Sequence, residues 1–275
     1  MTLVWGLLLA ICAAACYDGA IALQAAEARK VQTDDSLHPR LFARLVRRPR
    51  WLAAIALDGL GWPFQLGALA FVPLSVVQPA LALGLILLLA LGDRMLGERP
   101  GRTELLGVAL LTGGVALLAA VAPEHSHRHA GTTSLAIVSF VLASIALLPF
   151  VLGPRGPVLV AAAGAAFTLS ALTSKLVSDE LATGTFAGVL AWAAVTGLAA
   201  LLGKLAETGA LQRMTAASVA SPIFAVQAVV PVLAAPALTG EHWHAGVPAG
   251  LALVLGGTLL LGRSPAIVGL VEAAE

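Results

Sequence analysis

Charged side chains are scarce in this sequence, and their scarcity excludes most soluble folds. Asp, Glu, Lys and Arg make up 11% of the 275 residues, against about 25% in ordinary soluble domains. The 16 basic and 15 acidic side chains nearly cancel, so the chain lacks the basic surface that holds nucleic acid. Hydrophobic residues form 59% of the chain, and its mean hydropathy is +0.93. This composition predicts that most of the surface faces the lipid bilayer.

Cysteines and enzyme motifs are also nearly missing. Cys12 and Cys16 both lie in the first apolar stretch. Two cysteines are too few for a disulfide framework, so we expect them to be small core residues. The sequence holds no nucleophile–base set, phosphate-cradling glycine loop or dinucleotide fingerprint. It therefore predicts a protein that is not an enzyme and needs no cofactor.

Nine long apolar runs divide the sequence. A helix needs about 20 mostly apolar residues to cross the hydrocarbon core. Helices are expected because each segment must satisfy its own backbone polar groups in lipid. We therefore predict an all-α integral membrane protein with one polytopic domain over residues 1–275. Its nine predicted spans are residues 3–26, 51–71, 73–92, 103–122, 134–152, 158–178, 186–203, 215–238 and 247–262.

The basic residues orient these spans. With nine spans, 14 of the 16 Lys and Arg residues fall in loops on one side of the membrane, Lys204 among them in the loop after residues 186–203. Only Arg128 falls in a loop on the other side. Short loops rich in Lys and Arg are cytoplasmic. We therefore predict a multi-pass plasma-membrane protein with its N-terminus outside and its C-terminus in the cytoplasm.

One part of the chain repeats another at an offset of 143 residues. The matches that matter are not apolar ones but Pro, Gly-Glu and Gly-Gly at shared positions. They pair Ser75 with Ser218, Pro79 with Pro222, Gly97-Glu98 with Gly240-Glu241, Gly107 with Gly250, and Gly113-Gly114 with Gly256-Gly257. The sequence thus predicts a first repeat of four spans in residues 1–122, a linking span at 134–152 and a second repeat of four spans in residues 158–262.

The two predicted repeats have opposite topology, because the linking span inverts the second relative to the first. Inverted repeats are the ground plan of many secondary transporters, with a binding site near the midplane and two alternating states. We therefore expect a transporter of a small solute or cation that works by alternating access.

Two stretches carry a resemblance to a known family. LGERPGRTELLGVALLTGGVALL, at residues 96–118 and with its repeat, resembles the drug/metabolite transporter superfamily and its EamA-like repeats. The nine spans and ALAFVPLSVVQPALALG, at residues 68–84, are similar to the NIPA-type magnesium transporter branch. The first resemblance implies a small-solute transporter, and the second implies Mg²⁺ or a related divalent cation as the alternative substrate.

Two carboxylates lie inside the predicted spans at similar depth. Asp18 and Asp58 are each about two turns from the cytoplasmic end of their span. An ionisable group inside the membrane is a candidate functional residue, and two close carboxylates share a proton or bind a cation. The alternative is that both side chains reach the cytoplasmic water or cap a helix break.

Neutral polar side chains and prolines form a second candidate group. A proline inside a helix leaves the carbonyl one turn earlier without its donor, and broken spans of this kind line transporter cavities. Hydrogen bonding between helices explains any single one of them equally well. The group comprises Gln65, Ser75, Gln78, Pro79, Ser218, Ser221, Pro222 and Gln227.

The remaining candidates lie near the predicted outer face. Lys175 either extends outward beside Asp179 and Glu180 or contacts the substrate. Alternating histidines near a glutamate bind transition metals, although a solvated loop explains them as well. These histidines are His125, His127, His129, His242 and His244.

A non-transporting membrane scaffold is the alternative from another class. The basic loop at residues 27–50 and the histidine loops would hold its partners. Attraction to anionic lipid headgroups also explains the basic loop. Small residues on the lipid-facing helices are compatible with a homodimer.

Single cysteines in the loops test the orientation, in a chain whose Cys12 and Cys16 are first replaced by alanine. Cysteines placed in residues 123–131 or 239–246 should react with a membrane-impermeant maleimide in intact cells. Cysteines placed in residues 27–50 should react only after the cells are opened, because that loop is predicted to be cytoplasmic. Labelling of residues 27–50 in intact cells would overturn both the orientation and the inverted repeat.

Overall fold

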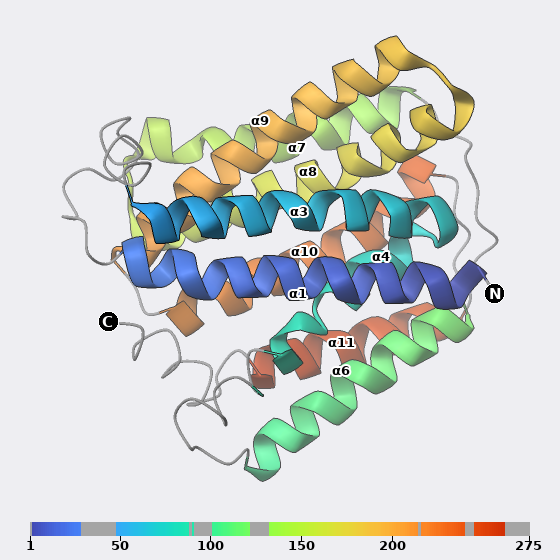
Figure 1. Ribbon diagram of the computed structural model, residues 1–275, viewed down its shortest axis with the longest axis horizontal. Helices are drawn as coiled ribbons and strands as arrows, with labels where there is room; N and C mark the ends of the chain where they lie inside the picture. The colour runs from blue at the N-terminus through green and yellow to red at the C-terminus, as the bar shows by residue number, and fades with distance from the viewer. Residues whose placement is uncertain are drawn as a thin grey trace.

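The computed structural model describes residues 2–28, 48–87, 90, 101–121, 132–213, 216–239 and 245–261, and within these ranges the regular structure is entirely helical. The helices follow the predicted apolar runs along the chain (Figure 1). They are α1 (Thr2–Ala28), α3 (Pro49–Phe71), α4 (Leu74–Leu81), α6 (Arg102–Ala120), α7 (Thr132–Leu152), α8 (Gly156–Thr183), α9 (Phe186–Leu211), α10 (Ala216–Thr239) and α11 (Gly246–Leu261).

Proline and glycine set several helix ends. Pro49 occupies the first turn of α3, where its missing N–H is not needed. Pro73 forces the preceding residue out of the helical region, and Val72 is accordingly extended, with φ −136° and ψ 143°. The chain therefore breaks between α3 and α4. Gly184 ends α8 in the left-handed conformation, with φ 76°, which glycine adopts without strain.

Six of the helices are long and apolar enough to cross a membrane: α1, α3, α6, α7, α8 and α9. The remaining apolar helical segments are shorter: Leu74–Leu87, which includes α4, Pro222–Ala234 in α10, and Gly246–Leu261, which is α11. Large apolar side chains cover the outer surface, and Val4, Phe140, Val151 and Phe186 are 61–81% exposed. Apolar helices with such a surface define a membrane-embedded all-α protein.

The helices pack in pairs (Figure 1). Helix α1 lies along α3, and α8 lies along α9, so each of these pairs joins neighbours in the chain. Helix α4 packs on α10, and α6 packs on α11, so these pairs join distant segments. Helix α8 is the most enclosed of the six long helices and also contacts α3, α7 and α10.

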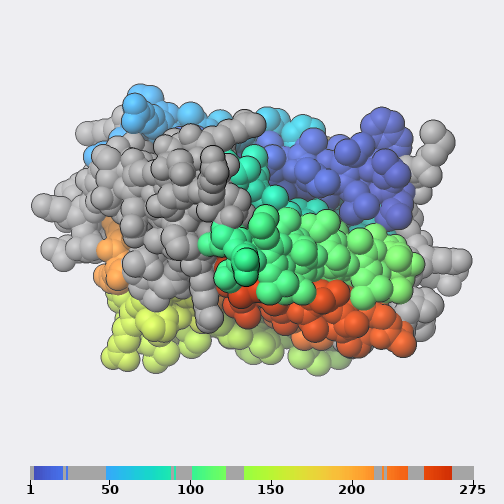
Figure 2. Space-filling view, turned by 90° about the horizontal axis from the view of Figure 1, so that it is seen from below, coloured from blue at the N-terminus to red at the C-terminus, as the bar shows by residue number. Residues whose placement is uncertain are grey.

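Helices α6 and α11 approach closely through glycines, and they lie side by side on one face of the molecule (Figure 2). A Cβ on Gly114 would lie 2.7 Å from the Val254 nitrogen and 2.9 Å from the Gly250 oxygen. A Cβ on Gly257 would lie 2.5 Å from the Leu111 nitrogen and 2.8 Å from the Gly107 oxygen. The early part of α6 thus meets the late part of α11, so the two helices are antiparallel.

Two expectations about single residues were wrong. Helix α9 continues to Leu211 instead of ending at residue 203, which puts Lys204 on a long apolar helix and not in a loop. Cys12 is exposed and Cys16 half-buried, so neither is a core residue. Alanine and leucine occur on all sides of α1. The apolar pattern therefore did not show which side of the helix is buried, and so the exposure of the two cysteines was not predicted.

The adjacent glycines of α6 allow a matched test of the α6–α11 contact. Gly114→Ala should lower the free energy of unfolding in detergent by about 1–3 kcal/mol, because the methyl group overlaps backbone atoms of α11. Gly113→Ala should leave it unchanged or raise it, since a Cβ there meets nothing within 4 Å and alanine favours the helix. Equal stability of the two variants would contradict this packing.

Candidate functional site

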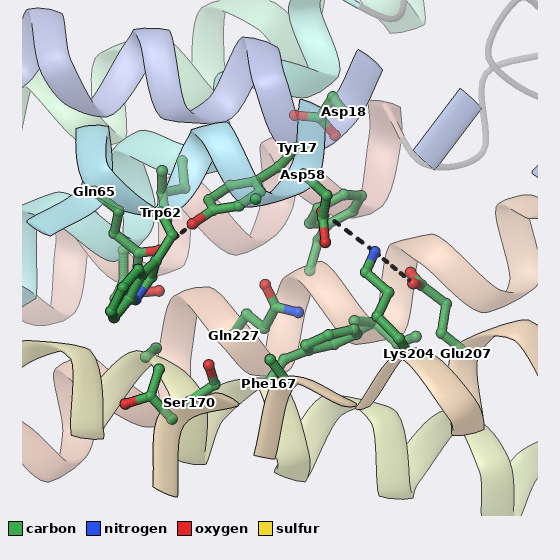
Figure 3. Close-up of a pocket in the computed structure, with 18 of the residues that line it drawn as sticks. Tyr17, Asp18, Asp58, Trp62, Gln65, Phe167, Ser170, Lys204, Glu207 and Gln227 are labelled. Carbon is green, nitrogen blue, oxygen red and sulfur yellow. Dashed lines mark hydrogen bonds and ion pairs between the residues drawn. The ribbon is translucent and has the colours of Figure 1, made fainter. Parts of the chain in front are cut away.

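A cavity of about 340 Å³ lies inside the described part of the bundle (Figure 3). Helices α1, α3 and α4 form part of its wall, and α8, α9 and α10 form the rest. Its size is at the lower end for small-molecule sites, and its mostly apolar wall with a few convergent polar groups is typical of them.

The charged groups of the cavity centre on Lys204. Its Nζ lies 3.0 Å from Oε2 of Glu207 and 3.5 Å from Oδ1 of Asp58, and Figure 3 shows it between the two carboxylates. It also lies 5.3 Å from the centre of the Phe167 ring. Helices α3 and α9 are not among the closely packed helix pairs, so the Asp58–Lys204 pair joins them across the cavity.

Neutral hydrogen bonds fix the side of the cavity away from this cluster. The Tyr17 hydroxyl donates to Oε1 of Gln65 at 2.6 Å, which ties α1 to α3. The Trp62 indole donates to the Ser174 hydroxyl at 3.0 Å, which ties α3 to α8. Because both donors are anchored, the two aromatic rings stand at fixed positions in the wall.

Prolines leave two helix carbonyls at the cavity without their usual donors. Pro63 lies inside α3, so the carbonyl of Gly59 receives no hydrogen bond from residue 63. Pro231 lies inside α10 and does the same to the carbonyl of Gln227. Gly59 and Gln227 both line the cavity, so the two proline breaks lie in its wall.

Five of the residues singled out from the sequence line this one cavity: Asp18, Asp58, Gln65, Gln78 and Gln227. Asp18 and Asp58, which the sequence paired as one candidate site, line the same cavity, and Asp58 lies 3.5 Å from the ammonium of Lys204. The sequence interpretation had placed that ammonium outside the membrane.

Other predicted residues lie away from the cavity wall. Ser75 and Pro79 are buried in α4, and Pro222 is exposed on α10. Lys175 does not reach outward as expected, because it is 1% exposed and its Nζ lies 2.6 Å from Oδ1 of Asp179. A buried ammonium needs a close carboxylate, and Asp179, one turn further along α8, supplies it.

Several predictions fall on residues whose placement the structure does not describe. Ser218 and Ser221 belong to α10, but their side chains lie outside the described set. The proposed metal ligands His125, His127, His129, His242 and His244 lie outside the described residues altogether. Within the described ranges, no three His, Cys, Asp or Glu side chains gather closely enough to hold a metal ion.

Sequence interpretation missed the cation of the cavity and its aromatic wall. Lys204 and Glu207 lie three residues apart on α9, and opposite charges at this spacing share a helix face. That spacing was the available signal that the helix continues beyond residue 203. Tyr17, Trp62, Phe167 and Phe224 line the cavity as well, but an aromatic residue in an apolar run has no pattern that separates a cavity wall from a lipid-facing surface.

Comparison with known proteins shows a partial likeness. No protein-family model matches the chain, and no solved structure does. An uncharacterized protein of Corynebacterium glutamicum is 35% identical to it over 91 residues, which are 33% of this chain. The match spans 32% of that relative's length.

Replacing Lys204 tests whether it holds the charged cluster together. Lys204→Met leaves Asp58 and Glu207 without their counter-ion. It should lower the free energy of unfolding by about 2–3 kcal/mol, less than for a fully enclosed pair because Asp58 is 22% exposed. Chemical unfolding in detergent measures the change.

Two further variants serve as controls. Arg155→Met removes an exposed cation at the start of α8 and should change the stability little. Lys204→Met combined with Glu207→Gln should recover part of the loss, because one of the two unpaired carboxylates is gone. Equal effects of Lys204→Met and Arg155→Met would show that the cluster is not a stabilising ion-pair network.

Proposed function

We propose that this protein is a secondary transporter of a small solute, of the drug/metabolite transporter type, that works by alternating access across the plasma membrane. The observation that carries the proposal is the cavity. Three of its helices, α1, α3 and α4, come from the predicted first repeat, and three, α8, α9 and α10, come from the predicted second repeat. A site between two inverted halves is the arrangement that alternating access requires.

Helix packing supports the inverted repeat. Each helix of the predicted first repeat has a counterpart in the second: α1 corresponds to α8, α3 to α9, α4 to α10 and α6 to α11. When each helix is replaced by its counterpart, the α1–α3 pair becomes the α8–α9 pair. The same exchange turns the α4–α10 and α6–α11 pairs into themselves. Contacts of a two-fold relation are reciprocal in this way, and repeats with opposite membrane topology are related by such an axis.

Individual contacts between α6 and α11 support the same relation. Gly107 faces Leu261 while Gly250 faces Leu118, and Gly114 faces Val254 while Gly257 faces Leu111. Each residue of one contact lies 143 positions from its counterpart in the other, which is the offset of the sequence repeat. We therefore retain nine membrane-crossing helices in the proposal, in which the shorter helices α4 and α10 pair with each other and the shorter α11 pairs with α6.

The charged cluster argues against magnesium as the solute. Mg²⁺ binds through carboxylates and retained water in octahedral geometry. At the Asp58 and Glu207 carboxylates of this cavity, the ammonium of Lys204 already lies within 3.5 Å and 3.0 Å. A divalent cation there would have to displace it. For this reason the proposal does not include magnesium transport of the NIPA type. It does not include a scaffold role either, because a scaffold has no need of an internal cavity.

Cysteine accessibility tests alternating access without knowledge of the solute. In a chain with Cys12 and Cys16 replaced by alanine, Ala200→Cys places a thiol on the cavity wall. A membrane-impermeant maleimide should label it from outside in right-side-out vesicles and from the cytoplasmic face in inverted vesicles. Both faces should reach it because the two states interconvert.

Ala163→Cys is the matched control. Ala163 is fully buried between helices and does not line the cavity, so its thiol should react from neither face. Labelling of Ala200→Cys from one face only would contradict transport, since a fixed pocket in a scaffold or receptor opens to one side.

A further inference from the structure

The ionisable groups of the cavity are unequal in sign. Among the described residues that line it are three carboxyl groups, those of Asp18, Asp58 and Glu207, and one ammonium, that of Lys204. That ammonium is shared by Asp58 and Glu207, at 3.5 Å and 3.0 Å. Asp18 remains, 1% exposed, and its Oδ1 has no hydrogen-bond donor among the described residues. Burial of such a group costs free energy unless a partner is supplied.

The Asp18 carboxyl group packs against Gly84, a glycine that follows α4. A Cβ at Gly84 would collide with the Asp18 carboxyl group and lie 3.1 Å from the carbonyl oxygen of Ala14. Gly84 follows α4 after a short turn at residues 82–83. The absence of a side chain there gives the carboxyl group its place between α1 and the segment that follows α4.

A second polar group of the same wall also lacks a partner. Gln78, on α4, is 3% exposed, and its Nε2 donates no hydrogen bond within the described part of the chain. Asp18 and Gln78 both line the cavity. One therefore offers a carboxyl oxygen as an acceptor, and the other offers a neutral amide donor.

We infer that the transported solute is a small amine that also carries a hydrogen-bond acceptor, such as an amino alcohol. Its ammonium group binds Oδ1 of Asp18, and its hydroxyl or carbonyl oxygen accepts from Nε2 of Gln78. Charge-assisted bonds of the first kind are the stronger, so Asp18 provides most of the affinity and Gln78 the selectivity. The inference rests on the proposed transport function and names its substrate class.

The rest of the cavity fits the carbon part of such a solute. Tyr17, Trp62, Phe167 and Phe224 present aromatic surface, which holds hydrocarbon chains and attracts ammonium groups. An anionic solute would meet three carboxylates and an ammonium already shared between two of them. The cavity therefore selects against carboxylates and phosphates.

An isosteric series of solutes tests both contacts with the purified full-length protein in detergent. 5-Amino-1-pentanol carries both groups, hexylamine lacks the acceptor, 1-hexanol lacks the amine, and 5-hydroxypentanoate replaces the amine with an anion. Calorimetric titration should find 5-amino-1-pentanol bound at least tenfold more tightly than each of the others. Failure of either amine to bind, or equal affinity for 5-hydroxypentanoate, would overturn the assignment.

Variants assign each contact to its residue. Asp18→Asn should remove the preference for 5-amino-1-pentanol over 1-hexanol, and Gln78→Met should remove its preference over hexylamine. Ser75→Ala is the control, because Ser75 is also buried on α4 with an unpartnered hydroxyl but does not line the cavity. It should change neither preference. The wild-type series keeps the test decisive where a variant fails to fold.

The result is separable from the transport proposal. If amines do not bind but Ala200→Cys is labelled from both faces, the protein transports a different class of solute. If amines bind as described but the thiol is reached from one face only, the amine site stands and the transport proposal is wrong. An unchanged amine affinity in folded Asp18→Asn overturns the role of Asp18 whatever the labelling shows.

Discussion

Enclosure of charge within an apolar bundle is the constraint on which this structure depends. An ammonium or carboxylate in such surroundings is stable only where an opposite charge lies close, and the sequence provides few charges with which to meet that need. Lys204 meets it for two carboxylates at once, one of them on α3. Since α3 and α9 do not otherwise pack closely, the ion pair is what joins these two helices and bounds the cavity between them. The buried pair of Lys175 and Asp179 follows the same rule within a single helix.

The bundle has two kinds of helix interface, and they involve different helices. One is the close glycine contact between α6 and α11, and the other surrounds the cavity. Helices α6 and α11 approach closely at glycines, where backbone atoms of one helix lie near backbone atoms and leucine or valine side chains of the other, and the described residues that line the cavity include none from either helix. Close backbone approach favours a fixed geometry, because dispersion contacts fall steeply with distance. The cavity helices are held by side chains instead, through ion pairs and hydrogen bonds of Asp58, Tyr17 and Trp62. Such side-chain contacts can exchange partners at less cost than packed backbones, which is the property that the proposed alternating access would need of the helices around the cavity.

The helices were predictable from the sequence because hydropathy and proline act locally. Apolar run length located every described helix, and Pro73 accounts for the break after α3. Five cavity residues were found because a polar side chain in an apolar run is conspicuous. The pairing of Asp58 with Lys204 was not predictable, because it depends on which helices meet in three dimensions. An error of two turns in the end of α9 was enough to place the decisive cation in water. The burial of Lys175 was missed for a related reason, since the sequence does not show which face of α8 is enclosed.

Pairing between distant helices has a consequence for the order in which the molecule is assembled. The α1–α3 and α8–α9 hairpins are made of neighbours and can form as soon as each second helix has left the ribosome. Helix α6 has its glycine surface ready early, but the matching surface belongs to α11, which is synthesised after all the other described helices. Helix α4 similarly waits for α10. Because domains form from the N-terminus during synthesis and distant contacts form slowly, the half-made chain passes through a stage in which α4 already has α1 and α3 beside it but lacks α10, and α6 lacks α11.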